Sequence, residues 1–324
     1  MLPGLIDLAS ELVGGKVLSA SDEFFAPKEN LLKTTAPVFV PDKYTDRGKW
    51  MDGWESRRKR APGHDWCVIS LGLPGVLRTV DVDTSHFLGN FPEHCSLDGA
   101  SAASDPAEKD FTPVVFKARL TGGGHNFFDA QHPGRMTHVR LNIFPDGGVA
   151  RVRVYGEVMP DLEELKTSSE PIDVASVVNG GRVLASSDSF FGHEQNLILP
   201  GRPANMGGGW ETRRRRGPGY DWIIVQLGAR AKVDKISVET EHYKGNYPDR
   251  CSIDLCDTRG ALLQDLITGK VAWSQMVPES RLAADAVRQF ENEFKVSPAA
   301  THVRLNIYPD GGVSRLRVFG KIVE

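Results

Sequence analysis

The sequence predicts an all-β protein made of two tandem jelly-roll β-sandwich repeats, and three observations support this fold class. Long blocks of sequence occur twice in the same order, which indicates that a whole domain was duplicated. Many short segments alternate polar and apolar residues, which is the period of a strand with one buried face. Glycine and proline turns separate these segments, and helical periodicity is sparse.

The duplication is visible in pairs of matching blocks. They lie at 14–32 and 180–198, 53–72 and 209–228, 80–98 and 236–254, and 137–156 and 301–320. The last pair contains LNIFPDGGVARVRVYG and LNIYPDGGVSRLRVFG, whose differences conserve the character of each side chain. Each unit is too long for a solenoid repeat and has the size of an independent domain.

The spacing between the blocks places the domain boundaries and the insertions. We expect the first repeat at 1–160, an acidic linker at 161–171 and the second repeat at 172–324. The first repeat has extra residues within 33–52, and the second has extra residues between 255 and 300. Both insertions should lie in loops, which tolerate added length better than strands do.

The next elements follow from periodicity and composition. Residues 65–71 and 80–84 alternate in polarity and are predicted to be strands. The best helical periodicity lies at 279–294, where we expect one short helix. Four tryptophans recur at fixed places around the blocks, and we expect them to pack in the cores. They are Trp54, Trp66, Trp210 and Trp222.

Each repeat ends in a pattern that predicts a β-hairpin. Residues 138–143 and 151–155 alternate in polarity, and the sequence Pro-Asp-Gly-Gly at 145–148 between them is typical of a turn. We therefore expect hairpins over 138–155 and 302–319.

Composition excludes several classes of protein. The chain has 324 residues, of which 40% are hydrophobic and 25% charged, as in ordinary globular proteins. A net charge of −3 argues against nucleic acid or an anionic membrane as a partner. No stretch approaches the ~20 apolar residues of a membrane helix, and the first residues lack the pattern of a signal peptide. The four cysteines have no metal-type pairing, which indicates reduced structural thiols and a cytoplasmic location.

The paired motifs resemble a known enzyme family. GWE[ST]RR, H[FY]xGN and RLNI[FY]PDGGV[AS]R[VL]R each occur twice and together resemble allantoicase, a family of galactose-binding-like, discoidin-type jelly rolls. The resemblance extends over nearly the whole chain, in both repeats. It implies hydrolysis of allantoate to ureidoglycolate and urea, in the degradation of purines through allantoin.

The implied chemistry requires a group that binds a carboxylate. Allantoate is a small carboxylate whose central carbon bears two ureido groups, and a guanidinium fork pairs bidentately with a carboxylate. The candidates for substrate binding lie in the arginine-rich loops and are Arg57, Arg58, Arg213 and Arg214. The alternative is that these loops are solvated and are partly neutralised by Glu55 or Glu211.

The reaction also requires protonation of the departing nitrogen and delivery of water, both of which suit general acid–base groups. The acid–base candidates are His86, His242, Glu55 and Glu211, and the candidates for hydrogen bonds to a ureido group are Asn90 and Asn246. The alternative for the histidines is a structural role that fixes the loop.

Several alternatives stay open at this point. The nine histidines show no metal-binding motif, so no cofactor is expected, although a divalent metal is not excluded. The arginines of the terminal strands bind an anion or form ion pairs across strands. The site belongs to one repeat, or lies between repeats or subunits of a homo-oligomer. The competing function is a non-catalytic, discoidin-like module that binds a carbohydrate or another small ligand.

Overall fold

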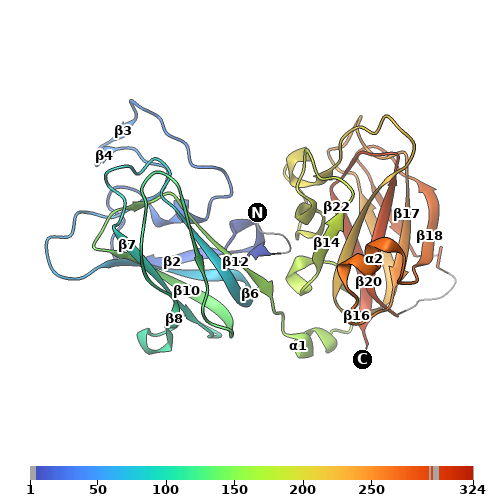
Figure 1. The fold of residues 1–324 in the computed structure, drawn as a ribbon, viewed down its shortest axis with the longest axis horizontal. Coiled ribbons are helices and arrows are strands. Elements are labelled where there is room, and N and C mark those ends of the chain that lie inside the picture. The colour runs from blue at the N-terminus through green and yellow to red at the C-terminus, as the bar shows by residue number, and fades with distance from the viewer. Residues whose placement is uncertain (1–4, 292, 295–298, 324) are drawn as a thin grey trace. The chain divides into compact units, whose positions relative to one another are not determined.

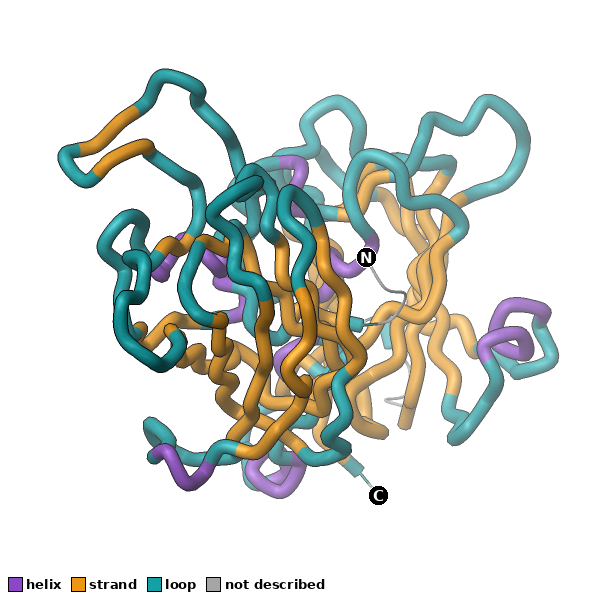
Figure 2. Tube along the Cα trace, turned by 60° about the vertical axis from the view of Figure 1, so that its left-hand side comes forward, coloured by secondary structure: helices purple, strands orange, loops and turns teal. Residues whose placement is uncertain are grey.

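The computed structural model describes residues 5–291, 293–294 and 299–323, and it divides the chain into units at 1–160 and 161–324 (Figure 1). Each unit is a β-sandwich jelly roll, which confirms the predicted fold class. Strands are the main regular structure of each unit, and the helices are short (Figure 2). No helix among the described residues is long and apolar enough to cross a membrane.

The first unit is organised around one long strand. Its strands are β1 (Ile6–Asp7), β2 (Lys16–Ala20), β3 (Tyr44–Thr45), β4 (Gly48–Lys49), β5 (Trp54–Glu55), β6 (Asp65–Asp83), β7 (His94–Ala100), β8 (Thr112–Arg119), β9 (His125–Asp129), β10 (Arg135–Phe144), β11 (Gly148–Val149) and β12 (Arg151–Val158). The order β1-β12-β6-β10-β7-β8 runs through the main sheet, and β2 and β9 also pair with β6. All of these pairings are antiparallel.

The second unit repeats this arrangement. Its elements are α1 (Leu162–Lys166), β13 (Ile172–Asp173), β14 (Arg182–Ser186), β15 (Trp210–Glu211), β16 (Asp221–Glu239), β17 (Arg250–Cys256), α2 (Leu263–Thr268), β18 (Ser274–Arg281), β19 (Val287–Phe290), β20 (Ala299–Tyr308), β21 (Gly312–Val313) and β22 (Arg315–Ile322). The order β13-β22-β16-β20-β17-β18 matches that of the first unit, with β14 and β19 also on β16.

The predicted terminal hairpins are wrong. β10 and β12 do not pair with each other, because β6 lies between them in the sheet order. The predicted strands at 65–71 and 80–84 are parts of the single strand β6, except for Thr84, which lies just beyond its end. The first half of β6 pairs with β10, and the second half pairs with β12. The turn sequence at 145–148 instead leads into β11, which begins at Gly148 and pairs with β5. The same correction applies to β20 and β22, which flank β16.

Two further expectations differ from the structure. The described part of the segment 279–294 contains no helix. The end of β18 and the whole of β19 lie in it, and β19 pairs with β16. The insertions also contain short elements. The small β3–β4 sheet lies within 33–52, and α2 lies between β17 and β18.

The cores form as the alternation predicts. Trp54 and Trp210 are fully buried, and the indole Nε1 of each donates to a backbone carbonyl at 2.8 Å. Trp66 and Trp222 are only half-buried, so the expectation of core packing holds fully for one tryptophan of each pair. All four cysteines are free and buried, as the reduced-thiol interpretation requires.

Candidate functional site

The arginine-rich loop of each unit lies between a two-residue strand and the long central strand. In the first unit it connects β5 to β6, and the β5–β11 pairing brings the Pro-Asp-Gly-Gly segment beside it. Gly147 has a φ of 140°, and a Cβ there would lie 2.7 Å from the carbonyl oxygen of Asn90. A glycine is therefore required for the loop carrying Asn90 to approach this segment.

Alternate side chains of the loop have different partners. Arg57 forms an ion pair with Asp22 at 2.6 Å, and Lys59 forms one with Asp65 at 2.8 Å. The backbone amide of Lys59 also donates to the Asp146 carboxylate at 2.8 Å. Arg58 lies between them and, within the described part of the chain, has no carboxylate partner. Arg60 also has no carboxylate partner among the described residues, but only Arg58 of the two lines the pocket described below and is placed to bind an added anion there.

The second unit repeats the alternation. Arg213 pairs with Asp188 at 2.7 Å, and Arg215 pairs with Asp221. Arg214 lies between them and likewise has no carboxylate partner among the described residues.

Arg58 and Arg214 line equivalent cavities. The first-repeat pocket has a volume of about 550 Å³, and its lining includes Phe25, Glu55, Ser56, Arg58, Asn90, Phe91 and Asp146. The second-repeat pocket has a volume of about 610 Å³, and its lining includes Phe191, Glu211, Thr212, Arg214, Asn246, Tyr247 and Asp310. Glu93 and Asp249 also line these pockets, so each combines an arginine of the loop, three carboxyl groups, an amide and two aromatic rings at equivalent positions of the chain.

A carboxyl–amide pair forms part of each pocket. Asn90 Nδ2 donates to Glu55 Oε1 at 2.8 Å, and Asn246 Nδ2 donates to Glu211 Oε1 at 2.5 Å. Burial raises the pKa of Glu55 above its ordinary value, although the hydrogen bond from Asn90 opposes the shift. A carboxyl group with a raised pKa retains its proton closer to neutral pH, as a general acid must.

Replacing Glu55 by glutamine is expected to stabilise the protein at pH 7. Between the pKa of Glu55 in the unfolded chain and its raised folded value, the folded state binds more protons, so the free energy of unfolding falls as pH rises. Glu55→Gln removes this loss while keeping an oxygen that accepts from Asn90. Urea denaturation should show a more stable variant at pH 7 and no difference below the unfolded pKa. A less stable variant at pH 7 would show that the ionised Glu55 stabilises the fold.

The histidine candidates contact the backbone. His86 and His242 both have a φ of 70°, a left-handed conformation that is uncommon for a residue with a side chain. His86 Nε2 lies 3.1 Å from the Pro37 carbonyl oxygen, and His242 Nε2 lies 2.9 Å from that of Pro203. This geometry matches the structural alternative, in which each ring fixes the loop, and their acid–base role stays an untested prediction.

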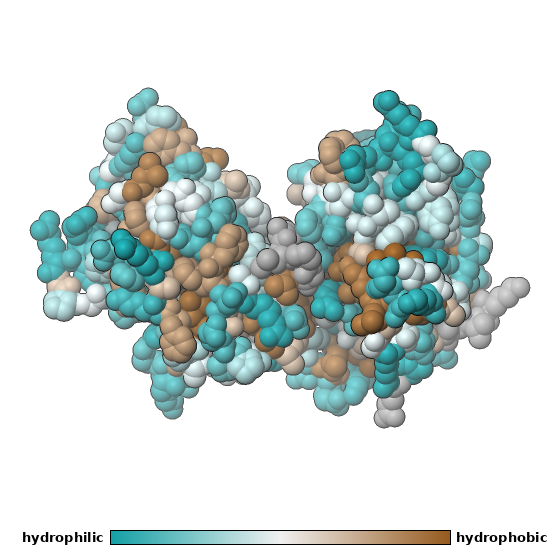
Figure 3. All heavy atoms as spheres, in the orientation of Figure 1, coloured by the Kyte–Doolittle hydropathy of each residue, from teal (hydrophilic) through white to brown (hydrophobic). Residues whose placement is uncertain are grey.

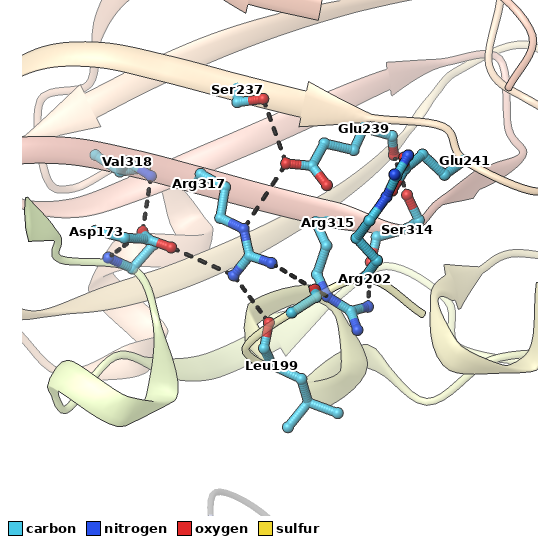
Figure 4. A network of polar contacts seen from close by, with 12 residues as sticks. Asp173, Leu199, Arg202, Ser237, Glu239, Glu241, Ser314, Arg315, Arg317 and Val318 are labelled. Carbon is cyan, nitrogen blue, oxygen red and sulfur yellow. Dashed lines mark hydrogen bonds and ion pairs between the residues drawn. The ribbon is translucent and has the colours of Figure 1, made fainter. Parts of the chain in front are cut away.

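The arginines of the terminal strands take part in ion pairs and hydrogen bonds to carbonyl groups. In the second unit Arg317 lies between Asp173, at 3.4 Å, and Glu239, at 3.8 Å, and donates to the Leu199 carbonyl (Figure 4). Arg140 and Arg304 likewise pair with aspartates on the neighbouring strand. The geometry favours the cross-strand ion pairs over anion binding at this face.

Sequence reasoning missed several lining residues. The sequence pattern around Asp146 indicates only a turn, but the Asp146 carboxylate accepts a hydrogen bond from the Lys59 amide and lines the pocket. Phe25 and Phe191 line the pockets from segments that carry no motif of their own. Only their equivalent positions in the first pair of repeated blocks would have indicated them. In the described parts of the chain, no three His, Cys, Asp or Glu side chains are placed to hold a metal ion.

Comparisons with known proteins agree with the duplication. The family model "Allantoicase repeat" matches the chain twice, at 6–159 and 172–323. A "Probable allantoicase" of Rhizobium meliloti is 49% identical, over 99% of this chain and 95% of the relative. A "Probable allantoicase 1" of Burkholderia mallei is 47% identical, over 98% of this chain and 94% of the relative.

A solved structure shows the same fold across the whole chain. The crystal structure of allantoicase from Saccharomyces cerevisiae superposes with a TM-score of 0.81 at 34% sequence identity. The match covers 98% of this chain and 93% of the yeast chain, so both units and their order are shared.

Proposed function

Because this chain belongs to the allantoicase family and is a hydrolase acting on allantoate, we propose that the reaction takes place in a pocket formed by the arginine-rich loop and the carboxyl–amide pair. The products are ureidoglycolate and urea. One observation supports this proposal most directly. The guanidinium of Arg58 lines the pocket and has no carboxylate partner among the described residues, whereas the neighbouring side chains of Arg57 and Lys59 are each paired with an aspartate.

The groups of the pocket match the parts of the substrate. We assign the substrate carboxylate to Arg58, because a guanidinium fork pairs with both oxygens of a carboxylate. The amide of Asn90 is within reach of a ureido group, since it already lines the pocket beside Glu55. Glu55 transfers the protons, because its raised pKa suits a group that is acid and base in turn.

The alternative of a carbohydrate-binding module accounts less well for the pocket. A neutral sugar needs few cations, whereas an unpaired guanidinium beside a carboxyl–amide pair suits a small anion. The family assignment, which covers both repeats, also favours the enzyme.

Purified protein mixed with allantoate is expected to release urea and ureidoglycolate. The test measures urea directly and glyoxylate from the breakdown of ureidoglycolate, against a sample without protein. It is run with and without added divalent metal, so that a metal requirement is seen as a difference. Binding of allantoate without any product under either condition would contradict an enzymatic function.

We also propose that the protein forms a homo-oligomer in the cytoplasm. Leu262, Leu263 and Ile267, in and beside α2, are 70%, 42% and 40% exposed, and hydrophobic atoms lie at the surface beside this helix (Figure 3). Large exposed apolar side chains that cluster are typical of contact surfaces. Size-exclusion chromatography with light scattering should give a mass above that of one 35.6 kDa chain.

A further inference from the structure

The first repeat has a second cavity that the sequence motifs do not predict. This side compartment has a volume of about 350 Å³ and adjoins the first-repeat pocket. The two cavities share Phe25, Glu55, Gly89 and Asn90. Glu55 therefore stands where they meet, with Arg58 lining only one of them.

The insertion of the first repeat builds this compartment. Phe39, Lys49 and Met51 line it from the segment 33–52, and His86 lines it from the loop after β6. His86 Nε2 lies 3.1 Å from the Pro37 carbonyl oxygen, and its ring stacks on Phe39 with the ring centres 5.7 Å apart. His86 thus contacts the insertion segment through both Pro37 and Phe39 where they lie beside the compartment.

The second repeat has a shorter loop here, and Met206 lies beside its carboxyl–amide pair. Met206 Sδ is 3.9 Å from Asn246 Nδ2, the same nitrogen that donates to Glu211. The Tyr243 hydroxyl donates to the Met206 carbonyl at 2.8 Å and holds this segment in place. Phe87 occupies the position of Tyr243 in the first repeat and has no hydroxyl to make such a bond.

The side compartment suits a planar, uncharged group that accepts hydrogen bonds. Lys49 Nζ lies 4.5 Å from the centre of the Phe39 ring and has no carboxylate partner among the described residues. Its ammonium can donate to a carbonyl oxygen. The aromatic rings of Phe25 and Phe39 offer apolar surface on which a flat group can pack. A ureido group has this combination of a flat shape and a carbonyl oxygen.

We propose that the first repeat is where allantoate is turned over, with the leaving ureido arm in the side compartment, the carboxylate on Arg58 and the central carbon beside Glu55. This inference rests on the proposed function. It adds which repeat carries out the reaction and where the departing group binds.

The step balances with the groups at hand. The bond between the central carbon and the leaving nitrogen breaks, helped by the lone pair of the remaining ureido nitrogen, while Glu55 gives its proton to the leaving nitrogen and urea forms. Water then adds its oxygen to the central carbon, and Glu55 takes back one proton. No oxidant or reductant is needed, and ureidoglycolate retains the other ureido arm.

The two repeats provide matched variants for a test. Glu55→Gln removes the proton-transfer group of the first repeat, and Glu211→Gln makes the same change in the second. General acid–base groups contribute roughly 100- to 10,000-fold to rate. We expect kcat for allantoate to fall at least about 100-fold in Glu55→Gln. The loss in Glu211→Gln should be smaller than this by a factor of about ten or more. Thermal unfolding of each variant establishes that it is folded.

A second pair of variants tests the compartment itself. Gly89 lines both cavities of the first repeat, and a Cβ on Gly89 or on its counterpart Gly245 meets no heavy atom within 4 Å. Gly89→Val therefore adds bulk at the junction, at a position where the added Cβ has no close neighbour in the free protein. We expect it to raise KM or lower kcat by about tenfold or more, with a smaller effect for Gly245→Val. Lys49→Met is expected to raise KM more than it lowers kcat.

The outcomes separate this inference from the proposed function. If the unmodified protein forms no urea, the proposed function fails. If the unmodified protein is active and the two repeats respond equally to both pairs of variants, turnover is not confined to the first repeat and the inference is wrong. A larger loss in Glu211→Gln than in Glu55→Gln would assign the reaction to the second repeat. If Glu55→Gln proves unfolded, the glycine pair decides alone.

Discussion

Replacing Arg58 by alanine is expected to lower kcat/KM for allantoate by about 10- to 150-fold. Hydrogen bonds to charged groups are worth roughly 1.5–3 kcal/mol, and each ~1.4 kcal/mol corresponds to a factor of ten in rate. Arg58 lines the pocket without a carboxylate partner among the described residues, so its removal leaves the substrate carboxylate without its cation. Steady-state kinetics with allantoate give the measurement.

The neighbouring arginine is the matched control. Arg57 is paired with Asp22 and its side chain is 64% exposed, so Arg57→Ala should change kcat/KM by less than about threefold. Arg58→Lys should recover little activity, because an ammonium cannot reproduce the planar fork. If Arg57→Ala and Arg58→Ala lose activity equally, the alternation of the loop does not determine which arginine binds substrate. A loss that follows a fall in melting temperature would mean that Arg58 supports the fold.

Replacing Asp52 by alanine is expected to destabilise the protein by about 3–5 kcal/mol, the usual effect of leaving a buried charge without its partner. Arg151 is 2% exposed and pairs with Asp52 at 2.7 Å. The same carboxylate accepts from the Val38 amide, at 3.1 Å, and thereby holds the insertion segment. The loss should be seen as a lower free energy of unfolding in urea at pH 7.

The pH dependence of stability and the control variant Lys33→Ala distinguish loss of the Asp52–Arg151 ion pair from a general destabilisation by the substitution. Burial by itself would raise the pKa of Asp52, but hydrogen bonds from Arg151 and Lys33 outweigh it and lower the pKa. The stabilisation is therefore present above the unfolded pKa of Asp52 and is lost as pH falls through its folded value. Lys33→Ala, which removes only a partly exposed partner, should cost less than about 1 kcal/mol. An equal loss in both variants would contradict the importance of the buried pair.

The second repeat lacks a counterpart of the Asp52–Arg151 ion pair, and the comparison shows what this pair does in the first repeat. Gly208 occupies the position of Asp52, and the buried Arg315 donates to carbonyl groups, including those of Asn196, Gly201 and Gly208. Burial lowers the pKa of Arg315 to about 10. The first repeat instead uses a carboxylate, which neutralises the arginine and holds the insertion in place.

The duplication and the strand content could be predicted from sequence, because both depend on local patterns. The pairing of strands could not. Residues 138–155 satisfy every local rule for a hairpin, yet β6 lies between the two strands. β6 is long enough to pair with both strands, and the turn sequence contains no signal that β6 lies between them. The helix prediction for 279–294 is wrong for a related reason, because the pairing of β19 with β16 outweighs the helical periodicity of this segment.

The lining of the proposed pocket follows from the sequence only in part. The motifs contain Glu55, Arg58 and Asn90, which line it, but they do not distinguish Arg57 from Arg58. That distinction depends on Asp22 and Asp146, which are distant in sequence and become neighbours of the loop only in the fold. The sequence does not predict the side compartment, because it is built by a segment that is longer than its counterpart in the second repeat and carries none of the repeated motifs.

The position of the last strand has a consequence for how each unit is made on the ribosome. β1 pairs with β12, and β12 covers the second half of β6, so residues near the start of the unit find their partners only at its end. Until β12 has been synthesised, the flank of β6 is an open edge that can pair with another chain. A nascent chain stalled before residue 151 should therefore be prone to aggregation. Release beyond residue 160 should allow the first unit to close while the second is still being translated.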